Sequence, residues 1–221
     1  QFTHFMSQYL GGADESRRLY DDNRKTGKYV WPKEHLIDLT FPQVLDRMVE
    51  EFPDQYAFRY TTLDYTRTYR EFREDVDNFA RALLSMGVTA GSKVAIWATN
   101  VPAWYITFWA TTKIGAILVT VNTAYKIHEA EYLLKQSDTH TLVMVESALD
   151  SDYAAIINEL CPELKETEAG KPLHSKKLPF LRNVISVGFS QPGSLTFDQV
   201  MARADMVPVE EVHRLAAAVK G

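Results

Sequence analysis

Short apolar runs of strand length alternate with helix-length segments through the middle of the chain. The strand-length runs are Lys93–Ala98, Ala116–Val121, Thr141–Val145 and Asn183–Val187, and the helical segments are Pro102–Thr112, Ile127–Gln136 and Tyr153–Leu160. Strands that are apolar on both faces are typical of a parallel sheet, because right-handed crossovers lay a helix over each face. The sequence therefore predicts an α/β fold with a mostly parallel sheet flanked by helices.

A helix and a small hairpin are expected ahead of this alternating region. Apolar residues recur at three-and-four spacing in Phe41–Phe52, which predicts an amphipathic helix. Gln55–Tyr60 and Tyr65–Tyr69 are strand-length segments on either side of a Leu63-Asp64 turn, and they predict a hairpin. A longer helix should begin after Thr68, because its hydroxyl and the carboxylate three residues later can cap two backbone amides.

The two ends of the chain differ from the middle. Residues 1–40 are polar and irregular, with a charged segment at Asp21–Lys28 and a Trp31-Pro32 corner. We therefore expect an amino-terminal extension over 1–40 and a single α/β subdomain over 41–221. Within the subdomain, residues 162–179 are charged and contain Gly170-Lys171-Pro172, which indicates a surface loop or a mobile excursion. Two further helices are expected, at Thr196–Ala204 and Val209–Lys220.

Charge and cysteine content exclude some classes of function. The net charge is -5, with 24 Lys and Arg against 29 Asp and Glu, so nucleic acid is not expected as a partner. The single cysteine, Cys161, cannot close an intrachain disulfide, and a cytoplasmic location is the expectation. Residues Val94–Thr112 carry no charge for 19 positions. A proline at 102 divides this stretch into a strand and a helix, so no transmembrane segment is predicted.

Motifs for phosphate and metal chemistry are incomplete. Gly188 and Gly193 have the spacing of a phosphate-binding loop, but Ser194 and Leu195 follow where a lysine is required. His128-Glu129 begins a zinc-protease signature, but Tyr132 stands where the second histidine should be. No two glycines have the spacing of a dinucleotide fingerprint. The sequence therefore predicts no catalytic residue, no metal site and no bound cofactor in this chain.

One polar loop is a candidate binding site. Asn122, Thr123, Tyr125 and Lys126 follow an apolar strand, and ligands of open parallel sheets bind at the carboxyl ends of strands. The alternative is that this loop only caps the next helix. A second concentration of residues, Trp104 to Trp109, has helical spacing and predicts a core helix packed on the sheet, with a ligand-stacking wall as the alternative.

The order of these pieces resembles a known family. The segments Thr68–Val88 and Gly91–Val143 resemble the amino-terminal part of an adenylate-forming (AMP-binding) acyl-CoA synthetase. Thr68-Tyr69-Arg70-Glu71-Phe72 resembles the family's first core motif. Lys113–Val119, with the sequence KIGAILV, and Asn122 together resemble the family's second core motif.

The resemblance implies a function for a larger protein. Such enzymes use ATP and magnesium to convert a carboxylate into an acyl-adenylate, and then transfer the acyl group to coenzyme A. Their phosphate loop, ribose-binding aspartate and catalytic lysine lie downstream of the part matched here. We therefore expect this chain alone to be inert and, with faces left uncovered, to self-associate.

The resemblance also carries over onto the polar loop and the aromatic residues ahead of the hairpin. The loop after the second motif lies near the cleft that coenzyme A enters, which implies weak roles for Asn122, Thr123, Tyr125 and Lys126. Thr123 stands where a proline is common in the family. Tyr20, Trp31 and Phe41-Pro42 suggest a fatty-acid or aromatic-acid member.

Two other functions stay open at this stage. One is a free-standing α/β interaction or regulatory module derived from such an enzyme, which a stop codon after Gly221 would favour. The other is a flavodoxin-like domain, which predicts that the chain alone binds ATP, AMP or FMN.

Overall fold

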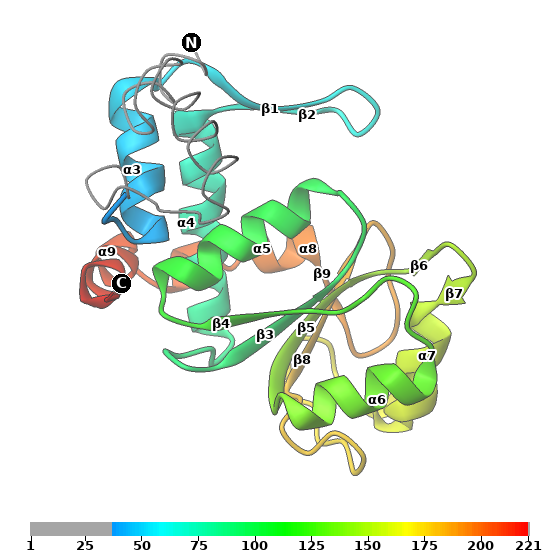
Figure 1. Cartoon of the computed structure of the whole chain (residues 1–221). Helices are drawn as coiled ribbons and strands as arrows, with labels where there is room; N and C mark the ends of the chain where they lie inside the picture. The colour runs from blue at the N-terminus through cyan, green and yellow to red at the C-terminus, as the bar shows by residue number, and fades with distance from the viewer. Residues whose placement is uncertain (1–36, 221) are drawn as a thin grey trace, which may run out of the picture. The chain divides into compact units, whose positions relative to one another are not determined.

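The computed structural model describes residues 37–220, of which residues 40–220 form one compact unit (Figure 1). Most of the expected extension, including Asp21–Lys28, the Trp31-Pro32 corner and Tyr20, lies outside the described residues, as does Gly221.

The elements follow the predicted order. The helices are α3 (Phe41–Glu51), α4 (Tyr69–Ser85), α5 (Pro102–Lys113), α6 (Ile127–Gln136), α7 (Tyr153–Leu160), α8 (Phe197–Met201) and α9 (Val209–Ala218), with short 3-10 helices η2 (Pro162–Glu166) and η3 (Ala204–Met206). The strands are β1 (Tyr56–Tyr60), β2 (Tyr65–Thr68), β3 (Lys93–Trp97), β4 (Ile117–Thr120), β5 (Thr139–Val145), β6 (Ser147–Ala148), β7 (Ser151–Asp152), β8 (Asn183–Val187) and β9 (Leu195–Thr196).

Five of these strands form the central sheet, in the order β4-β3-β5-β8-β9. Every neighbouring pair is parallel, which confirms the predicted fold class. The register places Val94 beside both Leu118 of β4 and Thr141 of β5. Because all five strands run the same way, their carboxyl ends meet at one edge of the sheet.

Helices cover both faces of the sheet (Figure 1). On one face, α4, α5, α8 and α9 bury a cluster that includes Phe79, Ile106 and Val212. On the other, α6, α7 and η2 bury a second cluster that includes Trp97 and Ile157. The molecule is therefore a three-layer α/β unit with two separate apolar cores.

The long helix α4 begins where the sequence places it. The Thr68 hydroxyl accepts from the Glu71 amide at 3.2 Å, and the Glu71 carboxylate accepts from the Thr68 amide at 2.8 Å. This reciprocal pair satisfies two amides that the first turn would leave unpaired. The hairpin β1–β2 packs against this helix through Phe58, whose ring centroid lies 4.6 Å from that of Phe72.

The aromatic helix α5 packs on the sheet as predicted. Ile106 and Ala110 are buried, while Trp104, Phe108 and Trp109 are half-buried. Phe41 of α3 contacts this aromatic group, with its ring edge-on to Phe108 at 5.1 Å between centroids. The tryptophans therefore belong to an aromatic cluster shared by two helices.

The segment 162–179 differs from its prediction. It was expected to be a surface loop or a mobile excursion, but Leu164, Leu173 and Leu178 are all at most 2% exposed. These leucines belong to the second core, and η2 carries the first of them. The reason is that three irregularly spaced leucines anchor the segment while most of its charged side chains face solvent.

Smaller differences concern the sheet margins and the last helices. The strand β4 was expected to be apolar on two buried faces, but it is an edge strand and Ile117 is 50% exposed. The predicted helix Thr196–Ala204 divides into α8 and η3. The hairpin β6–β7 and the edge strand β9 were not predicted. Among the described helices, none is long and apolar enough to cross a membrane.

Candidate functional site

The predicted polar loop follows β4 at the carboxyl edge of the sheet. The indole nitrogen of Trp97, at the end of β3, donates to the Asn122 carbonyl oxygen at 3.1 Å. The Asn122 side-chain oxygen accepts from the Ala124 amide at 2.9 Å, and the Tyr125 amide donates to the Asn122 carbonyl oxygen. Asn122 therefore shapes the turn instead of capping the next helix.

A buried tyrosine holds the centre of this loop. The Tyr153 hydroxyl donates to the Thr123 carbonyl oxygen at 2.7 Å, and its ring stacks on Trp97 with 4.0 Å between centroids. Tyr153 is fully buried, and burial raises the pKa of its hydroxyl. The Tyr153 hydroxyl on α7, a neutral hydrogen-bond donor, therefore fixes the backbone of the loop at Thr123.

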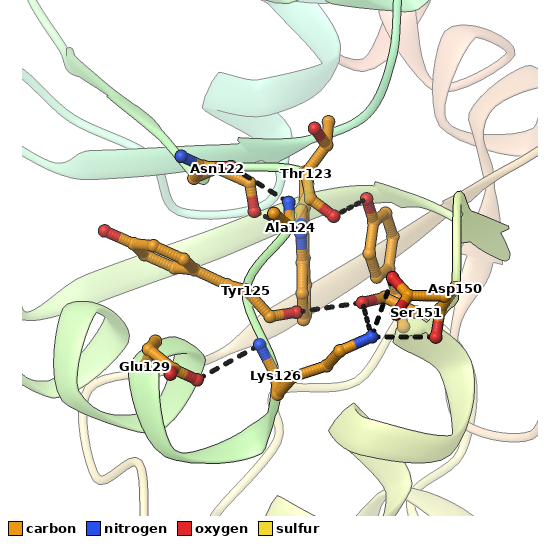
Figure 2. Close-up of polar contacts among 10 residues, drawn as sticks. Asn122, Thr123, Ala124, Tyr125, Lys126, Glu129, Asp150 and Ser151 are labelled. Atoms are coloured by element: carbon orange, nitrogen blue, oxygen red, sulfur yellow. Dashed lines mark hydrogen bonds and ion pairs between the residues drawn. The ribbon is translucent and has the colours of Figure 1, made fainter.

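Lys126 ties the loop to the hairpin β6–β7 (Figure 2). Its ammonium lies 2.9 Å from the Asp150 carboxylate and donates to the Asp150 carbonyl oxygen and the Ser151 hydroxyl, both at 2.8 Å. The hydrogen bond from Lys126 lowers the pKa of the Asp150 carboxyl. Figure 2 shows that the Glu129 carboxylate, not a loop side chain, accepts from the Lys126 amide at the start of α6.

The four predicted residues thus lie on one loop but differ in what they offer a ligand. Both Asn122 and Lys126 are exposed, but the Asn122 side-chain oxygen and the Lys126 ammonium are already bonded within the protein. The side-chain hydroxyls of Thr123 and Tyr125 have no hydrogen-bond partner within residues 37–220, and the Tyr125 ring points away from the Lys126 cluster (Figure 2). The hydroxyls of Tyr125 and Thr123 and the side-chain nitrogen of Asn122 are therefore the groups of this loop that are available to a ligand.

The structure also has a cavity at the carboxyl edge of the sheet, which was not predicted from the sequence. It has a volume of about 750 Å³ and lies between the ends of β5 and β8, the start of α5, the hairpin β1–β2 and α8. Its walls are mostly apolar, and Ile106, Phe197 and Met201 contribute to them. The rule that ligands bind at the carboxyl ends of parallel strands could have indicated it, had the rule been applied to these strands as well as to β4.

A polar network from the hairpin lines one side of this cavity. The Asp75 carboxylate accepts from the Arg67 guanidinium and from the Tyr65 hydroxyl, both at 2.8 Å. Burial and the neighbouring Asp75 carboxylate raise the pKa of the Tyr65 hydroxyl. The Arg67 charge is therefore paired within the protein, and the cavity presents a mainly apolar surface with one fixed polar corner.

The incomplete metal and phosphate-loop motifs can be compared with the described residues. No group of three or more His, Cys, Asp or Glu side chains within residues 37–220 could hold a metal ion. At Gly193 an added Cβ would lie 2.0 Å from the Leu164 carbonyl oxygen, so this glycine allows two backbone segments to approach closely. Its spacing from Gly188 thus has a packing explanation.

Comparisons with known proteins identify the family. A family model described as AMP-binding enzyme matches residues 45–207. A Bacillus subtilis protein named as an acyl-CoA synthetase, YngI, is 41% identical over 153 residues, which are 69% of this chain and 28% of that protein. The human mitochondrial medium-chain acyl-CoA ligase ACSF2 is 35% identical over 170 residues, or 77% of this chain and 28% of the ligase.

Solved structures show the same fold at lower identity. The anthranilate CoA ligase AuaEII in complex with anthranoyl-AMP superposes with a TM-score of 0.63 at 21% identity, covering 81% of this chain and 30% of that one. The Mycobacterium tuberculosis fatty acyl CoA synthetase gives a TM-score of 0.59 at 16% identity, covering 78% and 29%. The chain thus spans less than a third of these proteins. It belongs to the AMP-binding enzyme family and has the fold of the amino-terminal subdomain of adenylate-forming acyl-CoA synthetases.

Proposed function

We propose that this chain is the amino-terminal part of an enzyme that makes acyl-CoA. In the whole protein, a carboxylate oxygen attacks the α-phosphorus of ATP, which releases diphosphate and leaves an acyl-adenylate. The sulfur of coenzyme A then attacks the acyl carbonyl carbon, and AMP leaves. The observation that supports this most strongly is the family match over residues 45–207, together with 41% identity to an acyl-CoA synthetase.

We propose that the chain alone performs neither step. Both steps require positioned amides, cations and a magnesium ion around the triphosphate. Within residues 37–220, no group of three or more His, Cys, Asp or Glu side chains could hold a metal ion, and the loop after Gly188 has no lysine at the required place. Residues 41–221 would then be a structural subdomain preceded by an extension over 1–40, and the reacting groups would come from the rest of the enzyme.

The polar loop is the part of this chain that we assign to coenzyme A. It lies at the carboxyl edge of the sheet, and Tyr153 and Lys126 hold its backbone in place. Tyr125 and Thr123 have free hydroxyls, so we assign them direct contact with coenzyme A. Asn122 and Lys126 would act as positioning residues, because the Asn122 side-chain oxygen and the Lys126 ammonium already bind the protein.

We propose that the isolated chain associates with itself through the β4 edge. The amides of Ile117 and Val121 donate to the carbonyl oxygens of Ser92, just before β3, and Ile96. By the alternation of a strand, the backbone groups of Leu118 and Thr120 therefore face away from the sheet. No charged residue lies between Lys113 and Lys126 to discourage pairing. Two copies could pair antiparallel there, with Leu118 of each opposite Thr120 of the other.

A cytoplasmic location is also part of the proposal. Cys161 is buried, and burial raises the pKa of its thiol to about 11. A thiol held in its protonated form reacts slowly with oxidants and disulfides. A single buried, unpaired cysteine therefore fits a reducing compartment such as the cytoplasm.

The intact mass of the gene product and its reading frame test whether the chain is part of an enzyme. We expect a mass well above 25.2 kDa and a frame that continues into a Ser/Thr/Gly-rich loop ending in lysine. A mass of 25.2 kDa with a stop codon after Gly221 would instead support the free-standing module.

A further inference from the structure

A second hollow lies at the opposite, amino edge of the sheet. It has a volume of about 300 Å³ and lies between the end of α6 and the loop over residues 176–181 that leads into β8. Thr139, the first residue of β5, also lines it. We call it the amino-edge pocket. It shares no lining residue with the cavity at the carboxyl edge.

The floor of the amino-edge pocket is apolar. Leu134, Leu178 and Leu181 line it and are 3%, 2% and 1% exposed. Phe180 also lines it and is 55% exposed, which is unusual for a phenylalanine beside a buried floor. An apolar ligand that entered would cover leucine methyl groups and gain contact with an aromatic ring.

The rim is positively charged, although the whole chain is acidic. Lys135, Lys176 and Lys177 line the pocket against one carboxylate, that of Asp138. The Lys135 ammonium is paired with Glu131 one turn earlier on α6. The ammonium groups of Lys176 and Lys177 form no ion pair with any residue in 37–220. Lys177 lies near the Glu131 carboxyl and Lys176 near that of Glu163. Hydrogen bonds lower the pKa of each carboxyl and the nearby lysine lowers it further, but neither ammonium forms an ion pair with it. Two cations are therefore available at the mouth of an apolar hollow.

Hydrogen bonds hold this rim in place before any ligand arrives. The Lys176 amide donates to the Glu163 carboxylate at 3.1 Å, and the Leu178 amide donates to the Ser175 hydroxyl at 3.1 Å. The Arg182 guanidinium donates to the Pro179 carbonyl oxygen at 2.7 Å. Because the loop is already ordered, binding need not order its backbone, which reduces the free-energy cost of association.

We propose that the amino-edge pocket binds a small amphipathic anion. The ligand would carry one carboxylate, sulfonate or phosphate that meets Lys176 and Lys177, on an apolar body that covers the leucine floor. A volume of 300 Å³ corresponds to about ten water-sized atoms, which sets the size of that body. The site lies at the sheet edge opposite the polar loop, so this ligand is distinct from coenzyme A at that loop.

Leucine-methyl NMR on the 221-residue chain tests the proposal with octanoate as the probe. We expect octanoate to shift the methyl signals of Leu134, Leu178 and Leu181. Octanol, which lacks the charge, and inorganic phosphate, which lacks the apolar body, should each bind at least about tenfold more weakly than octanoate.

Paired lysine variants supply the control. The double variant Lys176→Ser with Lys177→Ser should weaken octanoate binding about tenfold, because it removes both free cations. Lys165→Ser with Lys171→Ser removes two exposed lysines outside the pocket and should bind octanoate normally. The proposal is wrong if octanol binds as tightly as octanoate, if the first double variant binds normally, or if the only leucine signal that shifts is that of Leu63, which lines the carboxyl-edge cavity.

Discussion

The Lys113 ammonium lies 2.6 Å from the Asp77 carboxylate inside the helical layer, with only 2% of the lysine side chain exposed. This pair joins the end of α5 to the middle of α4. Asp46 of α3 lies 3.7 Å from the same ammonium, and His213 of α9 lies 3.8 Å from the Asp77 carboxylate. A cation at the end of α5 also stabilises the helix dipole. The pair therefore fixes the segment from which β4 and the polar loop follow.

Breaking this pair should destabilise the fold strongly. Lys113→Met leaves the Asp77 carboxylate buried without its closest cation, which should lower the free energy of unfolding by about 3–5 kcal/mol. Adding Asp77→Leu should recover most of that loss, because both charges are then absent. As a control, Arg214→Met breaks an exposed pair with Glu211 and should change the free energy of unfolding far less, because solvent screens that pair. Urea denaturation measures all three, and equal losses for Lys113→Met and Arg214→Met would contradict the assignment.

Gly193 and Gly188 provide a matched test of the close backbone approach. Both have positive φ, 76° and 77°, so alanine is strained equally at each. Only at Gly193 does an added Cβ meet the Leu164 carbonyl oxygen, whereas nothing lies within 4 Å at Gly188. Gly193→Ala should therefore lower the free energy of unfolding by about 2 kcal/mol more than Gly188→Ala. Similar denaturation midpoints for the two variants would refute the packing role.

Tyr125 should affect coenzyme A and not the acid. In the full-length enzyme, Tyr125→Ala should raise the KM for coenzyme A about tenfold and leave the KM for the carboxylate unchanged, because it removes the hydroxyl that we assign to contact with coenzyme A. Tyr132→Ala removes an exposed tyrosine from α6 and serves as the control. Initial-rate kinetics distinguish the two. If Tyr125→Ala behaves like Tyr132→Ala, the assignment of Tyr125 to direct contact with coenzyme A is wrong.

Self-association should depend on Ile117. Sedimentation of the isolated chain should show a dimer that dissociates on dilution. Ile117→Lys places a charge on the half-exposed edge strand and should shift the chain toward monomer. Tyr132→Lys adds the same charge on α6 and should leave the dimer intact. A monomer at every concentration of the unaltered chain would rule out the edge pairing.

Regular elements with a long periodic pattern were predictable from the sequence. The bounds of α6 and α7 match their predictions residue for residue. Local capping chemistry likewise located the start of α4, since Thr68 and Glu71 interact within one turn. In each case the signal and its cause lie within a short stretch of chain.

Features that arise from distant residues were not predictable in the same way. Each strand of the hairpin β6–β7 has only two residues, so pairing defines it and no alternation could reveal it. The role of Lys126 depends on Asp150, which lies 24 positions away. The carboxyl-edge cavity combines the hairpin, α5 and α8, and only the folded chain brings them together.

Acid-dependent diphosphate release is the most direct test of the central claim that this chain is a non-catalytic part of an acyl-CoA synthetase. The protein encoded by the complete reading frame should release diphosphate from ATP and form acyl-CoA only when a carboxylic acid and magnesium are present. The 221-residue chain, assayed in parallel, should do neither. Acyl-CoA formation by the 221-residue chain, or no diphosphate release by the folded complete protein with any aliphatic or aromatic acid, would contradict the account.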